Sequence, residues 1–138
     1  DKGTITALYT VLVEGDDTNE PIADTARSIL DGHIILSRDL AARNHFPCIE
    51  VGHSVSRLFS NIASEGHKEA AGQMREVLAR YDEAEDLINI GAYVKGSNPK
   101  IDRAVEKIDR VNAFLRQGTM EDVPFDDSVN QMLQIFRR

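Results

Sequence analysis

The chain has 138 residues, of which 41% are hydrophobic and 28% charged, a composition typical of a soluble globular protein with one ordinary core. Its formal net charge of −7 argues against general binding to nucleic acid or to an anionic membrane, because both are polyanions. The single cysteine, Cys48, excludes an internal disulfide and fits a reducing, cytosolic setting. No apolar run approaches the roughly 18 residues that a membrane-spanning helix needs. The start at Asp1, without a methionine, suggests an excised fragment.

The first part of the chain alternates between strand and helix signals. Residues 4–13 are rich in β-branched and aromatic side chains and predict a strand buried on both faces. The acidic residues 14–21 lack the later glutamate of a calcium-binding EF-hand, so we expect a surface loop there. A short helix is predicted over residues 22–30 and a second strand over residues 33–37. This order indicates one edge of a parallel α/β sheet, whose other strands are missing or supplied by a partner.

The second part of the chain has helical periodicity. Ser64 is predicted to cap a helix whose apolar face carries Ala71, Met74, Leu78, Tyr81, Ala84 and Ile88. Asn98 and Pro99 begin a second helix, with an apolar stripe at Ile101, Val105, Ile108, Val111 and Leu115. A third helix is predicted over residues 125–136. The chain is therefore expected to have an α+β fold, mostly α, in which a small helical bundle follows the edge of a parallel α/β domain.

The chemistry-bearing residues gather between these two parts, in the stretch from Asn44 to Leu58. It contains a Phe46–Pro47 pair and ends on a Gly-x-Ser-x-Ser-Arg segment whose Arg57 has the reach and permanent charge to bind a phosphate. The alternative is an arginine in a surface salt bridge. Cys48 lies near two histidines in sequence, but a small buried thiol is favoured over a Cys–His nucleophile.

Several familiar motifs are absent from the sequence. The four histidines lack the spacing of metal ligands, so no metal site is expected. No Gly-Lys dipeptide occurs, and hence no Walker A loop to cradle phosphates. By itself, therefore, the chain has no complete active site and is expected to be inactive as an enzyme.

Three long runs closely resemble the type III secretion ATPase family, which includes the flagellar and injectisome ATPases and is kin to the catalytic subunits of rotary ATP synthases. They are GTITALYTVLVEGDD (residues 3–17), SILDGHIILSR (residues 28–38) and INIGAYVKGS (residues 88–97). The resemblance covers essentially the whole chain. It implies that residues 1–62 are the C-terminal part of a RecA-like ATPase domain without its Walker A and B motifs. Residues 63–138 would be the C-terminal helical domain.

The resemblance also implies roles for individual residues in a full-length parent that binds ATP and Mg at the subunit interfaces of a homo-hexamer. Arg57 matches the arginine finger that reaches the γ-phosphate in the neighbouring subunit. Phe46, of the Phe-Pro pair, matches the aromatic residue that packs on adenine, and Phe125 resembles a second wall of that pocket. The alternatives are that Phe46 plugs the core and that Arg57 forms a salt bridge.

Two loops resemble contacts with a central coiled-coil stalk protein in these relatives. One carries Asp16, Asp17, Thr18 and Asn19, and the other, over residues 91–99, carries Lys95. The family further implies export chaperone–substrate complexes as partners, a cytoplasmic position at the secretion apparatus, and peripheral membrane association through that apparatus. A second hypothesis is a non-catalytic helical module that binds export chaperones or the stalk. A stand-alone helical regulator is disfavoured by the two predicted strands, and general similarity favours a flagellar parent over an injectisome one.

Overall fold

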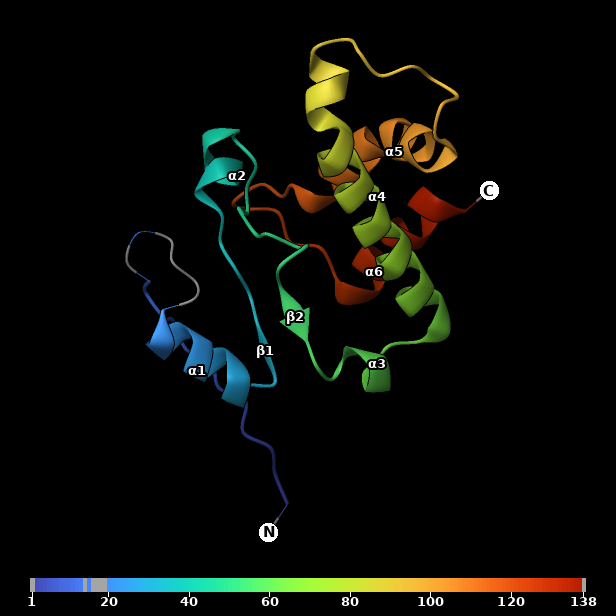
Figure 1. The fold of residues 1–138 in the computed structure, drawn as a ribbon. Helices are drawn as coiled ribbons and strands as arrows, with labels where there is room; N and C mark the ends of the chain where they lie inside the picture. Colours follow the sequence, from blue (N-terminus) through green and yellow to red (C-terminus); the bar gives the residue numbers. More distant parts are fainter. Residues whose placement is uncertain (1, 14, 16–19, 138) are drawn as a thin grey trace.

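Figure 1 shows the computed structural model of the chain, which describes residues 2–13, 15 and 20–137. Its elements in chain order are α1 (Pro21–Ile29), β1 (Gly32–His33), α2 (Arg38–Ala42), β2 (Val55–Ser56), α3 (Phe59–Ile62), α4 (Glu65–Asn89), α5 (Pro99–Leu115) and α6 (Phe125–Phe136). Helices α4, α5 and α6 pack together as a bundle, and α1, β1, α2 and β2 form a smaller lobe beside it (Figure 1). None of the described helices is both long and apolar enough to cross a membrane.

The bundle is built as its sequence predicts. The Ser64 hydroxyl accepts a hydrogen bond from the His67 N–H and caps α4, and the Asn98 side chain caps α5 in the same way through Lys100. The three helices share one core of buried residues: Ala70, Met74, Val77, Ala104, Ile108, Val111, Met132 and Ile135. Burying each large apolar side chain among them contributes about 1.5–3 kcal/mol. The predicted α+β class, mostly α, is confirmed.

Three of the predicted core positions lie at the edge of the bundle core instead of inside it. Val105 is 39% exposed, while Ala104, one residue earlier, is buried. Leu78 and Tyr81 of α4 are partly buried and pack against the cluster, whose fully buried α4 members include Val77. The apolar face of each helix is therefore rotated slightly from the predicted stripe, because contacts with the other two helices decide which positions face inward.

The lobe differs from its prediction in how its strands pair. Residues 4–13 form no strand: within the described part of the chain they make no ladder, and Ile5, Leu8 and Leu12 are 90–99% exposed. A strand is stable only beside a neighbour, and none of the described strands lies beside this segment. The expected second strand is also shorter than predicted, since only His33 of residues 33–37 belongs to β1.

The short strand β1 pairs antiparallel with β2, with Gly32 opposite Ser56 and His33 opposite Val55. A Cβ at Gly32 would come 2.6 Å from the Val55 carbonyl oxygen, so this close approach requires glycine. An isolated antiparallel bridge between Leu36 and Ile49 continues the pairing. This pairing places Arg57, directly after β2, beside the end of α1.

A compact set of contacts joins the lobe to the bundle. Arg43, the C-cap of α2, donates from Nη1 to Glu85 Oε1 of α4 at 3.1 Å. At the end of α5, the backbone N–H of Gln117 donates to the Phe46 carbonyl at 2.8 Å. We call these contacts, between residues 43–46 of the lobe and Glu85 and residues 115–117 of the bundle, the joint.

Candidate functional site

The Arg57 side chain lies against the last turn of α1. Its Nη2 atom donates to the carbonyl oxygens of Arg27 and Ser28, both at 3.1 Å, and its backbone N–H donates to the Asp31 carbonyl at 2.8 Å. A cation is favourable there because the carbonyls at a helix C-terminus carry partial negative charge. Arg57 forms no salt bridge with any described residue, so the predicted alternative of an ion-paired arginine does not describe this arrangement.

The Arg57 guanidinium is only partly engaged by these contacts. The residue is exposed, and both side-chain hydrogen bonds come from a single nitrogen. Within the described part of the chain, Nε and Nη1 have no hydrogen-bond partner. An arginine held at one nitrogen keeps the charge and the remaining donors that an incoming phosphate oxygen can accept.

Phe46 stands at the joint, half in solvent. The ring is 49% exposed, and the Phe46–Pro47 peptide bond is cis. Phe46 lines a shallow pocket of about 320 Å³ together with Asn44, Arg116, Gln117 and Gly118. The alternative that Phe46 plugs the core does not hold for this structure, because a core residue would be buried. An open aromatic face beside two amide side chains suits a planar, hydrogen-bonding base.

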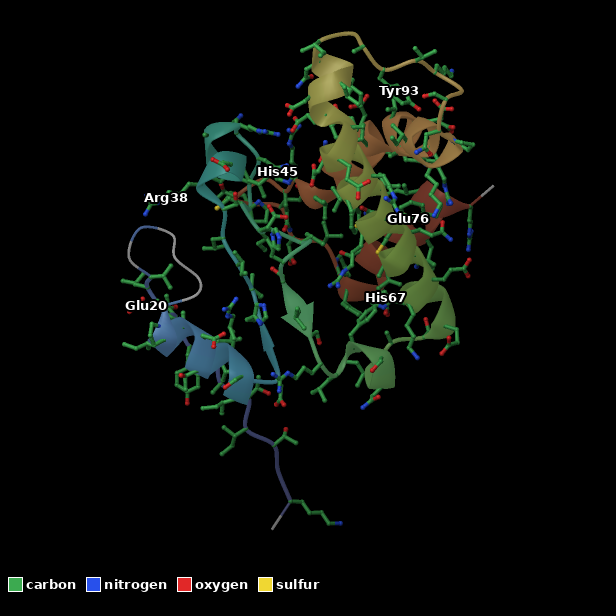
Figure 2. All side chains as sticks on the ribbon, viewed as in Figure 1. Glu20, Arg38, His45, His67, Glu76 and Tyr93 are labelled. Atoms are coloured by element: carbon green, nitrogen blue, oxygen red, sulfur yellow. The ribbon has the colours of Figure 1, made fainter. Side chains whose placement is uncertain are left out.

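Phe125 lies in different surroundings. It is the first residue of α6 and is 72% exposed. Its ring centroid lies 6.1 Å from that of His67 in the first turn of α4, and His67 packs edge-on against Phe59 at 5.0 Å. Figure 2 shows His67 well apart from His45, the residue next to Phe46. Among the described residues, Phe46 and Phe125 make no ring contact, so this structure does not bring together the two walls of the predicted pocket.

Of the two predicted stalk loops, only the second can be described. Asp16, Asp17, Thr18 and Asn19 lie outside the described residues. Lys95 is exposed in the connection between α4 and α5. This connection contains Gly91 and Gly96 at φ +70° and +91°, conformations that favour glycine.

The Asp102 carboxylate closes the connection between α4 and α5. It accepts hydrogen bonds from the Tyr93 hydroxyl at 2.9 Å and from the Gly96 N–H at 2.9 Å. Burial, together with the hydrogen bond to Asp102, raises the pKa of the Tyr93 hydroxyl (Figure 2 labels Tyr93). The sequence analysis did not single out Asp102, since an acid in the first turn of a helix resembles an ordinary dipole-compensating residue.

Titratable groups also gather at the joint. His45 is 5% exposed, and burial and the nearby Arg116 charge hold the pKa of its ring below the usual range. On α4, burial raises the pKa of Asp82, and the carboxylates of Glu50 and Glu85 raise it further. From the sequence, His45 was considered only as one of two histidines near Cys48, because a lone histidine carries no recognisable pattern.

The described residues fit the two parts of the Mg–ATP that the resemblance implies to different degrees. The exposed Phe46 ring and its pocket fit a nucleotide base, and Arg57 fits a phosphate. Within the described part of the chain there is no group of three His, Cys, Asp or Glu residues that could hold a metal ion. A full-length parent that binds magnesium would therefore need ligands from outside the described part of this chain.

The two parts of the chain match two family models. Residues 1–56 match the nucleotide-binding domain of the ATP synthase alpha/beta family, which defines the class of the lobe. Residues 63–134, more than half of the chain, match the T3SS EscN ATPase C-terminal domain. The chain belongs to the type III secretion ATPase family.

Individual relatives agree with this assignment. The Bacillus subtilis (strain 168) flagellum-specific ATP synthase is 54% identical over 127 residues, which are 92% of this chain and 29% of that protein. The assembled ATPase EscN of the enteropathogenic E. coli type III secretion system is 41% identical, with a TM-score of 0.93 over 97% of this chain and 32% of that one. EscN in complex with its central stalk EscO is 37% identical, with a TM-score of 0.78 over 83% and 28%. The chain thus spans about a third or less of each of these proteins.

Proposed function

We propose that this chain acts as the C-terminal region of a ring-forming ATPase that energises type III protein export. The observation that carries the proposal is a pair of matches: the bundle to the T3SS EscN ATPase C-terminal domain, and the lobe to the nucleotide-binding domain of the ATP synthase alpha/beta family. A second observation supports it: the residue that matches the arginine finger is exposed and only half engaged. The parent would bind ATP and Mg and hydrolyse ATP.

Arg57 is the catalytic residue of this chain in the proposal. Its guanidinium enters the nucleotide site of the neighbouring subunit and stabilises the negative charge that develops on the γ-phosphoryl oxygens during hydrolysis. The contacts with the α1 carbonyls support this role, because they hold Nη2 in place while leaving Nε and Nη1 for the phosphate.

Phe46 supplies one wall of the adenine site and stacks on the base. The pocket it lines also presents the side chains of Asn44 and Gln117, whose amides can donate to or accept from the base edge. Phe125 is proposed as the second wall. Since it lies apart from Phe46 in this chain, it would reach the base only after α6 and the lobe move closer, or from another subunit.

The partners follow from the assemblies in which the relatives were solved. The relatives' structures contain an assembled EscN and an EscN bound to its central stalk EscO. By analogy, we propose a homo-hexamer around a coiled-coil stalk that meets Lys95 and the loop with Asp16, Asp17, Thr18 and Asn19. Export chaperone–substrate complexes, a cytoplasmic position and peripheral membrane association through the export apparatus complete the proposal.

A non-catalytic interaction module remains the second candidate. The observation that favours it is the exposed, internally braced connection between α4 and α5, which presents Val94 and Lys95 to a partner without any catalytic group. The two functions differ in whether Arg57 matters for turnover, which gives the test below.

The test replaces Arg57 in the full-length enzyme that carries this chain. Arg57→Ala should lower kcat about 10³- to 10⁵-fold while nucleotide affinity stays nearly unchanged, because a finger acts on charge formed in the transition state. Arg57→Lys is the matched control: it can still reach the α1 carbonyls but loses the two-pronged geometry, so it should rescue little. Steady-state kinetics and calorimetry measure both quantities. Normal turnover in Arg57→Ala would exclude the catalytic role and favour the interaction module.

A further inference from the structure

His45 is the one buried polar or charged side chain among the residues that the structure describes. It follows α2 and precedes Phe46, and Figure 2 shows it between α2 and the bundle. Its ring lies close enough to the Leu115 backbone, at the end of α5, and to the Arg116 charge for both to affect the pKa of the ring. Its own backbone N–H donates to the Leu40 carbonyl of α2 at 2.9 Å. The buried His45 side chain thus lies between the ends of two helices, α2 and α5.

The bonds on either side of His45 fix the chain that carries Phe46. The Phe46 carbonyl accepts from Gln117 at 2.8 Å, and Arg43 reaches Glu85 at 3.1 Å. Between them, Asn44 adopts φ 55°, a conformation that asparagine tolerates better than most residues. These bonds restrict the backbone conformation of residues 43–46, and this restriction also limits the direction in which the Phe46 ring projects.

The wall opposite Phe46 is held by the same end of α5. Gln117 donates from Nε2 to the Glu121 carbonyl at 2.8 Å, and the Gly118 N–H donates to Glu121 Oε2 at 2.9 Å. Phe46 and Gln117 line the same pocket. The ring and the amide side chain thus stand on two segments that the Gln117–Phe46 hydrogen bond joins, with the buried His45 beside that bond.

We infer that His45 is a positioning residue, which holds Phe46 against the end of α5 and so sets the aromatic stack offered to a nucleotide base. The inference rests on the proposed function, because it needs Phe46 to contact the base. His45 itself touches no substrate. Its contribution is to limit the rotation of the Phe46 segment before the nucleotide arrives, which reduces the ordering cost of binding.

A buried histidine that only stabilises the fold would look similar in a static structure. The two roles differ in what a substitution changes. A structural histidine affects the unfolding temperature and leaves nucleotide affinity alone once the protein is folded. A positioning histidine acts on the affinity for a nucleotide, and only while Phe46 is present to be positioned.

The test measures ADP dissociation constants by calorimetry in the full-length enzyme that carries this chain. The variants are Phe46→Ala, His45→Leu, His45→Gln, and the double variant of His45→Leu with Phe46→Ala. Leucine fills the buried space without a donor, and glutamine keeps an N–H for the Leu115 carbonyl. Should His45→Leu fail to fold, His45→Met, which is flexible and also lacks a donor, takes its place.

Phe46→Ala is expected to weaken ADP binding about two- to tenfold, the range of one aromatic stack. His45→Leu should weaken it by a similar factor, His45→Gln by less, and the double variant by no more than Phe46→Ala alone. If the losses of ADP affinity in the two single variants multiply in the double variant, the inference about His45 is wrong. It is also wrong if His45→Leu binds ADP normally while Phe46→Ala binds it more weakly. Neither result would contradict the proposed base site. An unchanged affinity in Phe46→Ala would overturn the proposed base site and the inference with it.

Discussion

The bundle buries its large apolar side chains, whereas the lobe leaves most of its own exposed. The bundle encloses its apolar side chains: Met74 and Val111 are 4% and 0% exposed. In the lobe, Ala23 and His45 are the only buried residues among those described, and Leu8 and Leu12 are 93% and 90% exposed. A helix satisfies its backbone within itself and needs only a packing face, whereas a strand needs neighbours for both its backbone and its faces.

The difference in burial parallels a difference in the roles proposed for the two regions. The self-contained bundle provides a rigid support and the connection that carries Lys95. The lobe carries Phe46 and Arg57, and both are exposed. Phe125, proposed as the second wall of the adenine site, lies in the bundle at the start of α6 and is also exposed. Exposed groups of this kind would suit the site between subunits that is proposed above.

The largest effect on stability is expected in the bundle core. Met74→Ala removes a buried side chain that packs against α5 and α6, so the free energy of unfolding should fall by about 2–5 kcal/mol. Met120→Ala makes the same chemical change at a residue that is 94% exposed, and should stay within about 0.5 kcal/mol. Urea unfolding of this chain measures both.

In the lobe, the substitution to compare with Met74→Ala is Leu8→Ala. Leu8→Ala should change the stability of this chain by less than about 0.5 kcal/mol, because its side chain is 93% exposed. In the longer ATPase proposed above, where further strands could pair with residues 4–13, the same change should cost about 2–5 kcal/mol. Equal effects in the two proteins would show that the lobe does not depend on further strands.

A smaller, local effect is expected at the connection between the bundle helices. Asp102→Ala removes the acceptor for Tyr93 and Gly96, and two hydrogen bonds of this kind are worth about 1–3 kcal/mol. Amide exchange over residues 92–97 should accelerate about tenfold or more, while the centre of α5 keeps its protection. Tyr93→Phe removes one of the two bonds and should give an intermediate rate. Uniform acceleration across α5 would instead indicate global destabilisation.

The smallest expected effect is the pH dependence of the free energy of unfolding that His45 contributes at the joint. The pKa of His45 in the folded chain lies below its ordinary value of 6.5, so the unfolded chain binds a proton more readily. Stability should therefore fall as the pH drops below about 6.5, by at most about 1.4 kcal/mol per pH unit for one proton. His45→Gln should remove this part of the pH dependence. Urea midpoints at pH 5.5 and 7.5 for both proteins give the comparison; identical slopes would contradict it.

The bundle could be predicted from the sequence more completely than the lobe. Helices α4, α5 and α6 were predictable because caps such as Ser64 and Asn98 and the apolar period are local signals. The strand over residues 4–13 was predicted wrongly, since composition reports how well a segment suits a sheet and not whether neighbours are present. The two-residue strand β2 is too short to leave a pattern.

The site residues divide in a similar manner. Arg57 and Phe46 could be selected from their motifs, and their roles stay predictions. The comparisons assign the chain to a family without testing individual residues. The contacts of Arg57 and Phe46 could not be predicted, because the α1 carbonyls and residues 116–118 are distant in sequence from the residues they meet. Asp102 accepts hydrogen bonds that form only in the folded chain, and His45 becomes buried only there. Residue type and spacing alone do not indicate either feature.

Mixed rings show most directly whether Arg57 acts in the nucleotide site of a neighbouring subunit. Full-length subunits carrying Arg57→Ala are assembled with subunits whose own Walker lysine is replaced, and ATP hydrolysis is measured after mixed assembly is verified. Some interfaces then pair an intact phosphate-binding loop with an intact Arg57 from the next subunit. Action of Arg57 in the neighbouring site should give partial activity from two parents that are each inactive. No activity in verified mixed rings, or full activity in rings of Arg57→Ala alone, would contradict that role.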